Sequence, residues 1–229
     1  MGTSMKSPRL ERAFRIAAAS LGSAVALQGC SSEGGSDWFY LLQATRAAWE
    51  DRDAPVKLND AAAIPYATLG IRVDGGREQI LILAVDTDNE RLWTSSASVA
   101  ITTLHGRITR TSGFGTDLSG YIANSREPED WSRPHRYSWS ADFADLGYYS
   151  VPITCDVQPV GPDPIEILGS QIDTVRADET CRSDRFDWSF QNSYWVSRST
   201  GRVWRSVQHV HPKGPALEIE ILRPPLSAG

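Results

Sequence analysis

The chain has 229 residues, of which 41% are hydrophobic and 22% charged, and its formal net charge is −5. The apolar fraction is enough for a sizeable core, and the length suits one large all-β domain or two small ones. The acidic balance argues against a nucleic-acid partner, because such a surface repels phosphate backbones.

Residues 1–29 have the pattern of a bacterial signal peptide. Arg9, Arg12 and Arg15 form a basic start, and the apolar run "IAAASLGSAVAL" follows. That run of about a dozen residues suits a signal peptide and is too short to span a bilayer. Its removal leaves a mature chain with a net charge of about −8.

Cys30 closes the sequence Leu27-Gln28-Gly29-Cys30, which resembles the lipobox of bacterial lipoproteins. In that motif the cysteine carries acyl chains such as palmitate and becomes the new N-terminus. The alternative is an ordinary secretory signal with a chance cysteine. Residues 30–36 then form a flexible tether, and Ser31 after the cysteine favours the outer membrane of a Gram-negative bacterium. We therefore expect a lipid anchor, with about 0.8 kcal/mol per buried CH₂, on a protein facing the periplasm.

Residues 37–229 are expected to form a single β-rich domain that begins with one helix. Ser36 or Asp37 suits its N-cap, and the segment 51–55 ends it. An apolar stripe at helical spacing predicts that the helix packs on a sheet, with a partner-binding face as the alternative; the stripe consists of Trp38, Leu41, Leu42, Thr45 and Trp49.

Short apolar and alternating runs separated by turn residues predict strands from Ile64 onward. Asp74-Gly75-Gly76 and His105-Gly106 are typical of hairpin turns, and His105 and Gly106 both need a positive φ. Residues 113–134 are rich in glycine, serine, proline and acids, so we expect an irregular excursion there. In the last strand, "ALEIEIL", Leu217, Ile219 and Ile221 should face the core.

Cys155 and Cys181 remain as an even pair in an oxidising periplasm, which predicts a disulfide. A bridge closing about 25 residues would stabilise the fold by about 3–4 kcal/mol. Two free buried thiols or a metal site are the alternatives. No histidine lies near either cysteine in sequence, which makes a zinc site a poor interpretation.

No motif in the chain marks a catalytic residue, a cofactor site or a metal site. There is no G-x-S-x-G, and the short acidic run from Asp86 to Glu90 is better read as a hairpin turn than as a calcium loop. His209 and His211 lie two residues apart on one strand face, where two metal ligands could converge. No Cys, Asp or Glu lies close in sequence to complete a metal site, and Pro212 ends the strand, so we expect a solvated strand end instead. The chain has eight tryptophans, whose rings fill the core of a curved sheet in the simpler interpretation and stack on sugar faces in the alternative. Trp131, in a polar loop, is the one we expect to be exposed and able to contact a glycan.

Several runs together resemble the YjbF/GfcB family of bacterial lipoproteins, encoded in exopolysaccharide and group 4 capsule loci. Besides the lipobox, they are "IPYA" at 64–67, "LHGRITRTSGFGTDL" at 104–118, "YWV" at 194–196, "TGRVWRSVQ" at 200–208 and "LEIEILRPP" at 217–225. The resemblance implies a large, highly twisted, antiparallel or mixed sheet curled into a half-barrel. We therefore expect a mainly β fold with one mostly antiparallel sheet, on which the predicted N-terminal helix packs. It also implies a role in making or exporting extracellular polysaccharide, without supplying an activity.

These observations together predict a non-enzymatic accessory lipoprotein of exopolysaccharide or capsule production. Its partners would be the membrane, through the lipid, and either polysaccharide or other proteins of the export machinery. The alternative is a periplasmic glycan-modifying hydrolase or lyase whose paired carboxylates are distant in sequence. No cofactor is expected in either case.

Overall fold

The computed structural model describes residues 61, 63–87, 90–125 and 131–225. Cys30, the tether and the expected N-terminal helix lie outside these residues. In the described part of the chain, no helix has the length and apolar character that a membrane crossing requires.

Twelve strands form one antiparallel sheet in the order β5-β4-β3-β2-β1-β14-β13-β12-β11-β8-β7-β6. Its first seven strands in chain order are β1 (Thr68–Val73), β2 (Gln79–Asp86), β3 (Arg91–Thr94), β4 (Ala100–Leu104), β5 (Arg107–Ser112), β6 (Gly120–Ala123) and β7 (His135–Phe143). They are followed by β8 (Tyr148–Pro162), β11 (Thr174–Ser183), β12 (Trp188–Ser197), β13 (Val203–His209) and β14 (Ala216–Arg223). The 3-10 turns η1 (Ala144–Leu146) and η2 (Asp184–Phe186) join β7 to β8 and β11 to β12, while β9 (Ile165–Ile167) and β10 (Ser170–Ile172) form a separate two-stranded sheet.

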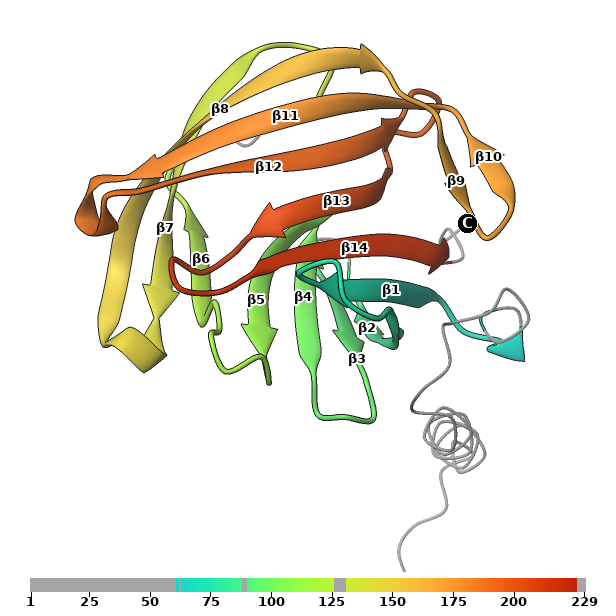
Figure 1. Ribbon diagram of the computed structural model, residues 1–229, viewed down its shortest axis with the longest axis horizontal. Coiled ribbons are helices and arrows are strands. Elements are labelled where there is room, and N and C mark those ends of the chain that lie inside the picture. Colours follow the sequence, from blue (N-terminus) through green and yellow to red (C-terminus); the bar gives the residue numbers. More distant parts are fainter. Residues whose placement is uncertain (1–60, 62, 88–89, 126–130, 226–229) are drawn as a thin grey trace, which may run out of the picture.

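The large sheet curls until its two edge strands, β5 and β6, approach each other (Figure 1). Thr111 of β5 donates its backbone N–H to the carbonyl of Leu118, two residues before β6, at 2.9 Å. The sheet is therefore nearly closed, and the half-barrel that the family resemblance implied is confirmed. Figure 1 shows the long strands β8, β11 and β12 arching over the shorter strands β2 to β6.

Apolar side chains at alternate positions of the strands fill the interior of the curled sheet. In β14, Leu217, Ile219 and Ile221 belong to the main core, as predicted from the sequence. Glu218 and Glu220 lie on the opposite, convex face, because successive side chains of a strand point to opposite sides. The core residues of β14 therefore lie on the concave face of the sheet.

The predicted turn at His105-Gly106 joins β4 to β5 with φ angles of 48° and 89°. Gly106 has a second reason to be glycine, since an added Cβ would lie within 2.9 Å of three side-chain carbons of Val203. Val203 opens β13, which lies five strands away from β4 in the sheet. The curl thus brings the β4–β5 turn against the start of β13.

Residues 113–134 are not wholly irregular, because β6 occupies 120–123 within them. This strand is short and includes a glycine, so its composition resembles a turn. It forms because β7 offers a long partner, with Gly120 to Ala123 pairing against Trp139 to Asp142.

The predicted bridge between Cys155 and Cys181 is present and joins β8 to β11 at directly opposed positions. A smaller apolar cluster lies apart from the main core, where the β9–β10 hairpin contributes Ile165 and Ile167 beside Leu222. The long strands are therefore stabilised by the disulfide between β8 and β11 and by the smaller apolar cluster at the β9–β10 hairpin.

Candidate ligand pocket and the buried network behind it

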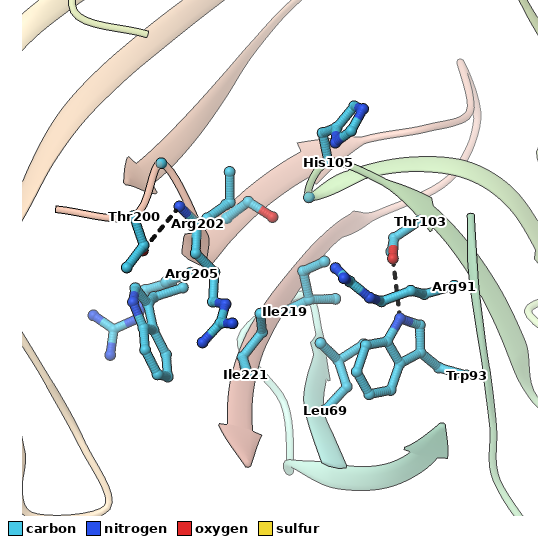
Figure 2. Close-up of a pocket in the computed structure, with 15 residues that line it drawn as sticks. Leu69, Arg91, Trp93, Thr103, His105, Thr200, Arg202, Arg205, Ile219 and Ile221 are labelled. Carbon is cyan, nitrogen blue, oxygen red and sulfur yellow. Dashed lines mark hydrogen bonds between the residues drawn. The ribbon is translucent and has the colours of Figure 1, made fainter. Parts of the chain in front are cut away.

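A pocket of about 260 Å³ lies on the concave face of the sheet. Leu69 of β1 and Ile219 and Ile221 of β14 form an apolar floor between two walls, as Figure 2 shows. One wall comes from β3, β4 and the β4–β5 turn, and the other from the β12–β13 loop and β13. The lining residues of the two walls are Arg91, Trp93, Thr103, His105 and Gly106, and then Thr200, Gly201, Arg202, Val203, Trp204, Arg205 and Ser206.

The pocket exists because two turns distant in sequence meet. Gly106 packs on Val203, and Gln208 fastens the same turn by donating its Nε2–H to the carbonyl of Gly106 at 2.9 Å. Gln208 also donates to the hydroxyl of Ser206, at 2.8 Å, and accepts the backbone N–H of Ile108, at 3.0 Å. The relative position of the two walls is therefore set by buried polar contacts as well as by packing.

The charged lining residues are cationic. Among the described residues that line the pocket there is no aspartate or glutamate. Arg91 donates from Nε to Asp86 at 2.9 Å, and Arg205 donates from Nε to Glu220 of the convex face at 2.6 Å, so each of these two charges has a counter-ion. Arg202 has no carboxylate partner among the described residues, and its guanidinium lies 5.4 Å from the centre of the Trp204 ring. Within the described part of the chain, one positive charge at the pocket therefore has no counter-ion.

A buried polar network fills the interior behind the β4–β5 turn. Glu179 of β11 is fully buried and accepts two hydrogen bonds from Arg107 of β5, at 2.6 and 3.2 Å. It also accepts from the hydroxyl of Tyr137, from Nδ2 of Asn192 at 2.8 Å and from the hydroxyl of Tyr194 at 3.3 Å. We call Arg107, Tyr137, Glu179, Asn192 and Tyr194 the inner network, because it joins β5 to β7, β11 and β12 across the curl.

Burial and charge act in opposite directions on the inner network. Burial alone would raise the pKa of Glu179, but the positive charge of Arg107 and hydrogen bonds from Arg107, Tyr137 and Asn192 outweigh it and lower that pKa. Burial raises the pKa values of Tyr137 and Tyr194 well above their ordinary range. The carboxylate is therefore charged and the phenols are neutral at physiological pH, the state in which every one of these hydrogen bonds is satisfied.

The sulfurs of Cys155 and Cys181 lie within 4.8 Å of the Glu179 carboxylate and of each other. This is the one grouping of three potential metal ligands among the described residues. Both cysteines are held in the disulfide, which takes away the thiolates that a metal would need. The grouping is part of the core around the inner network.

The structure corrects the expectation that Trp131 is exposed. Its side chain is buried, with a residue exposure of 6%, and its ring centre lies 4.2 Å from that of Tyr194. The polar loop around Trp131 hid this contact, since Tyr194 is 63 positions later in the sequence. The ring extends the core beside the inner network. The glycan contact was expected because the ring was expected to be exposed, so its burial removes the basis of that expectation.

His209 and His211 have separate partners. His209 Nδ1 lies 3.0 Å from the carbonyl of Gln191, while His211 is buried, with Nε2 3.2 Å from Asp145 and its ring edge-on to Phe143. A solvated strand end does not describe His211. Its histidine ring joins η1 to the segment after β13.

The pocket and the inner network were both missed in the sequence, although one signal was present. Ala177, Glu179 and Cys181 alternate along β11, so a carboxylate shares the inward face with a disulfide cysteine. A charged residue in phase with core residues predicts a buried charge. Its partner Arg107 is 72 positions away, and nothing local in the sequence pairs the two.

Comparisons with known proteins agree with this architecture. The family model described as "Group 4 capsule polysaccharide lipoprotein gfcB, YjbF" matches residues 42–222. The chain is 23% identical over 212 residues to the uncharacterized lipoprotein GfcB of Escherichia coli K12, covering 88% of this chain and 95% of that protein. It is 25% identical over 160 residues to the uncharacterized lipoprotein YjbF of the same strain, covering 66% and 73%.

The crystal structure of the hypothetical lipoprotein YmcC from Escherichia coli K12 has the same fold, with a TM-score of 0.69 at 22% identity, and the match covers 86% of this chain and 100% of that one. Three of the runs that carried the resemblance, at 104–118, 200–208 and 217–225, all contribute residues to the pocket. Since the family model spans most of the chain, this protein belongs to the YjbF/GfcB family of group 4 capsule polysaccharide lipoproteins.

Proposed function

We propose that this protein is a periplasmic lipoprotein, anchored in the outer membrane through Cys30, that assists capsule or exopolysaccharide production or export without catalysing a reaction. The lipobox, the tether at residues 30–36 and membership of the family support the anchor and the process. A tether of this composition would give the folded part of the chain freedom to engage a partner while the lipid holds it at the membrane.

The character of the pocket supports a binding role. Retaining and inverting glycosidases place two carboxyl groups across the sugar, about 5–9.5 Å apart. The described residues that line this pocket supply none, and the buried Glu179 is fully engaged by Arg107 and neutral donors. A concave site with an apolar floor and a few polar groups is suited to holding a ligand. This carboxylate-free lining is the observation that carries the proposal.

Deletion of the gene tests the proposed process. We expect less surface or secreted polysaccharide, with intracellular precursor synthesis unchanged. Normal polysaccharide in the deletion strain would contradict the role. Rapid depolymerisation of the cognate polysaccharide by the purified protein, without added cofactors, would establish the hydrolase or lyase instead.

Replacement of the anchoring cysteine tests the location. Cys30→Ser should release the protein into the soluble periplasmic fraction or block its maturation, as followed by fractionation and immunoblotting. A Cys30→Ser protein that stays in the outer-membrane fraction at normal size would show that the anchor has been assigned wrongly.

A further inference from the structure

We propose that the pocket between the β4–β5 turn and β13 binds a single carboxylate-bearing sugar unit of an acidic polysaccharide, with Arg202 as the residue that pairs with the carboxylate. This inference rests on the proposed function for the choice of a glycan. The negative charge and the size of the unit are argued from the pocket itself.

Charge selects the kind of ligand. The protein as a whole is acidic, yet the described lining residues carry guanidinium groups and no carboxylate. Asp86 compensates Arg91, and Glu220 compensates Arg205, whereas Arg202 is left without an anionic partner among the described residues. A ligand with one negative group would complete the charge balance, and a neutral ligand would leave Arg202 unpaired.

The surroundings of Arg202 favour a carboxylate on a ring. Its guanidinium is near the Trp204 ring, at 5.4 Å, and a planar guanidinium offers two parallel N–H donors that match a carboxylate. Below it, Ile219 and Ile221 offer an apolar surface, and Figure 2 shows Arg91 on the opposite wall, beside Trp93. An aliphatic floor between walls that carry aromatic rings and charged donors suits a sugar ring that bears an acid group.

Size limits the ligand to one unit. The volume of about 260 Å³ lies below the range of about 300–1,000 Å³ that is typical for drug-sized ligands. A single pyranose ring is compatible with this space, and neighbouring units of a chain would extend over the rim, past Thr200 and His105. The half-exposed Arg202 and the exposed Thr200 and His105 give the pocket its accessible edge.

The rigidity of the walls supports binding. Gln208 fixes the turn that carries His105 and Gly106, and the side-chain hydroxyl of Thr200 accepts the backbone N–H of Arg202 at 3.3 Å. Groups held in place before the ligand arrives lose less conformational entropy on binding. The pocket therefore needs little rearrangement to receive its ligand.

Calorimetric titration of the full purified lipoprotein in detergent tests the proposal. The probes are short oligomers of galacturonate, glucuronate and N-acetylneuraminate, the methyl-esterified galacturonate oligomer of the same length, and inorganic phosphate. The ester keeps the sugar skeleton and removes the charge. We expect at least one acidic oligomer to bind, at least tenfold more tightly than the ester and than phosphate.

Three variants locate the site. Arg202→Gln should lower the affinity for the acidic oligomer at least tenfold, and Arg202→Lys should lie between it and the wild type because the charge stays while the planar donors are lost. Arg198→Gln removes the same charge from an exposed position in the same β12–β13 loop, outside the lining, and should change the affinity less than twofold. Thermal unfolding confirms that each variant is folded.

Several results would overturn the inference. They are binding of none of the acidic oligomers, equal binding of acid and ester, phosphate binding as tight as that of the oligomers, or equal losses in Arg202→Gln and Arg198→Gln. Such results would leave the proposed accessory role intact if gene deletion still reduced polysaccharide. A normal deletion strain together with specific acidic-sugar binding would instead retain the site and reject the role.

Discussion

The inner network and a second charged cluster, on the convex face, differ in how they offset the free-energy cost of burying a charged carboxylate. The second cluster, which we call the outer network, joins β1, β13 and β14 and consists of Arg72, Glu78, Arg205, Glu218 and Glu220. The inner network surrounds one carboxylate with one guanidinium and three neutral donors. The outer network has three carboxylates for two guanidiniums.

The difference is visible in two glutamates. Glu179 is the more deeply buried, yet its pKa is lowered, since Arg107 and the surrounding hydrogen bonds outweigh the burial. For Glu78, burial raises the pKa, and the nearby Glu220 and Glu218 add to that rise against the attraction of Arg72. The number of donors that face a carboxylate, and the other negative charges beside it, therefore decide its ionisation more than its depth does.

Removal of the inner guanidinium should have the largest effect. Arg107→Ala leaves Glu179 as a buried charge with neutral donors alone, and we expect a loss of about 3–5 kcal/mol in the free energy of unfolding. Urea unfolding measures it. Arg72→Ala is the matched change in the outer network, where partial exposure of the side chain (30%) and the remaining Arg205 limit the loss to about 1 kcal/mol.

The double variant Arg107→Met with Glu179→Leu sharpens this comparison. Buried ion pairs are often replaced by apolar side chains at little cost, so the double variant should recover part of the stability lost in Arg107→Ala. Recovery should stay incomplete, because Tyr137 and Asn192 would lose their acceptor. Equal losses for Arg107→Ala and Arg72→Ala would contradict the distinction between the two networks.

Loss of the disulfide should have the next largest effect. Cys155 and Cys181 are separated by 26 positions, and a closed loop of that length is worth about 3–4 kcal/mol in the chain-entropy model. The variant Cys155→Ser with Cys181→Ser should lose about this amount, measured as urea unfolding with the wild type under oxidising conditions. Reduction of the wild type should produce a similar loss, and unchanged stability after reduction would contradict the structural role of the bridge.

Much of the fold could be predicted from local sequence. The His105-Gly106 turn follows from residues that tolerate positive φ, and strict alternation around Ile219 assigns the two faces of β14. The pairing of Cys155 with Cys181 follows from the count of cysteines and from the expected compartment. These predictions are confirmed because each depends on neighbouring residues or on the number of cysteines in the chain.

The candidate site could not be predicted in the same way. The pocket requires Gly106 to touch Val203, and the inner network requires Arg107 to reach Glu179, and both contacts depend on how far a twelve-stranded sheet curls. The exposure predicted for Trp131 is wrong for the same reason, since a polar local sequence carries no information about a tyrosine on a distant strand. Local patterns predict which face a residue occupies, and the curvature of the sheet decides what that face meets.

Glu78→Gln should have the smallest effect, and its sign tests the comparison most directly. The raised pKa of Glu78 already includes the attraction of Arg72, so ionisation of this carboxyl is a net cost in the folded state. Its favourable contribution is present below the ordinary value of 4.5 and is lost as the pH rises through the folded pKa. At pH 7, Glu78→Gln should therefore match or exceed the wild type in stability, by less than about 1 kcal/mol.

The pH dependence of two matched variants completes this test. The advantage of Glu78→Gln should shrink toward zero as the pH falls below about 4, where the wild-type carboxyl is protonated in both states. Glu179→Gln should behave in the opposite way. It is less stable than the wild type at pH 7, and its deficit narrows as the pH falls through the lowered pKa of Glu179. Urea unfolding of the three proteins from pH 7 to pH 3 measures both trends. If both variants were less stable than the wild type at pH 7, the proposed difference between the two networks would be contradicted.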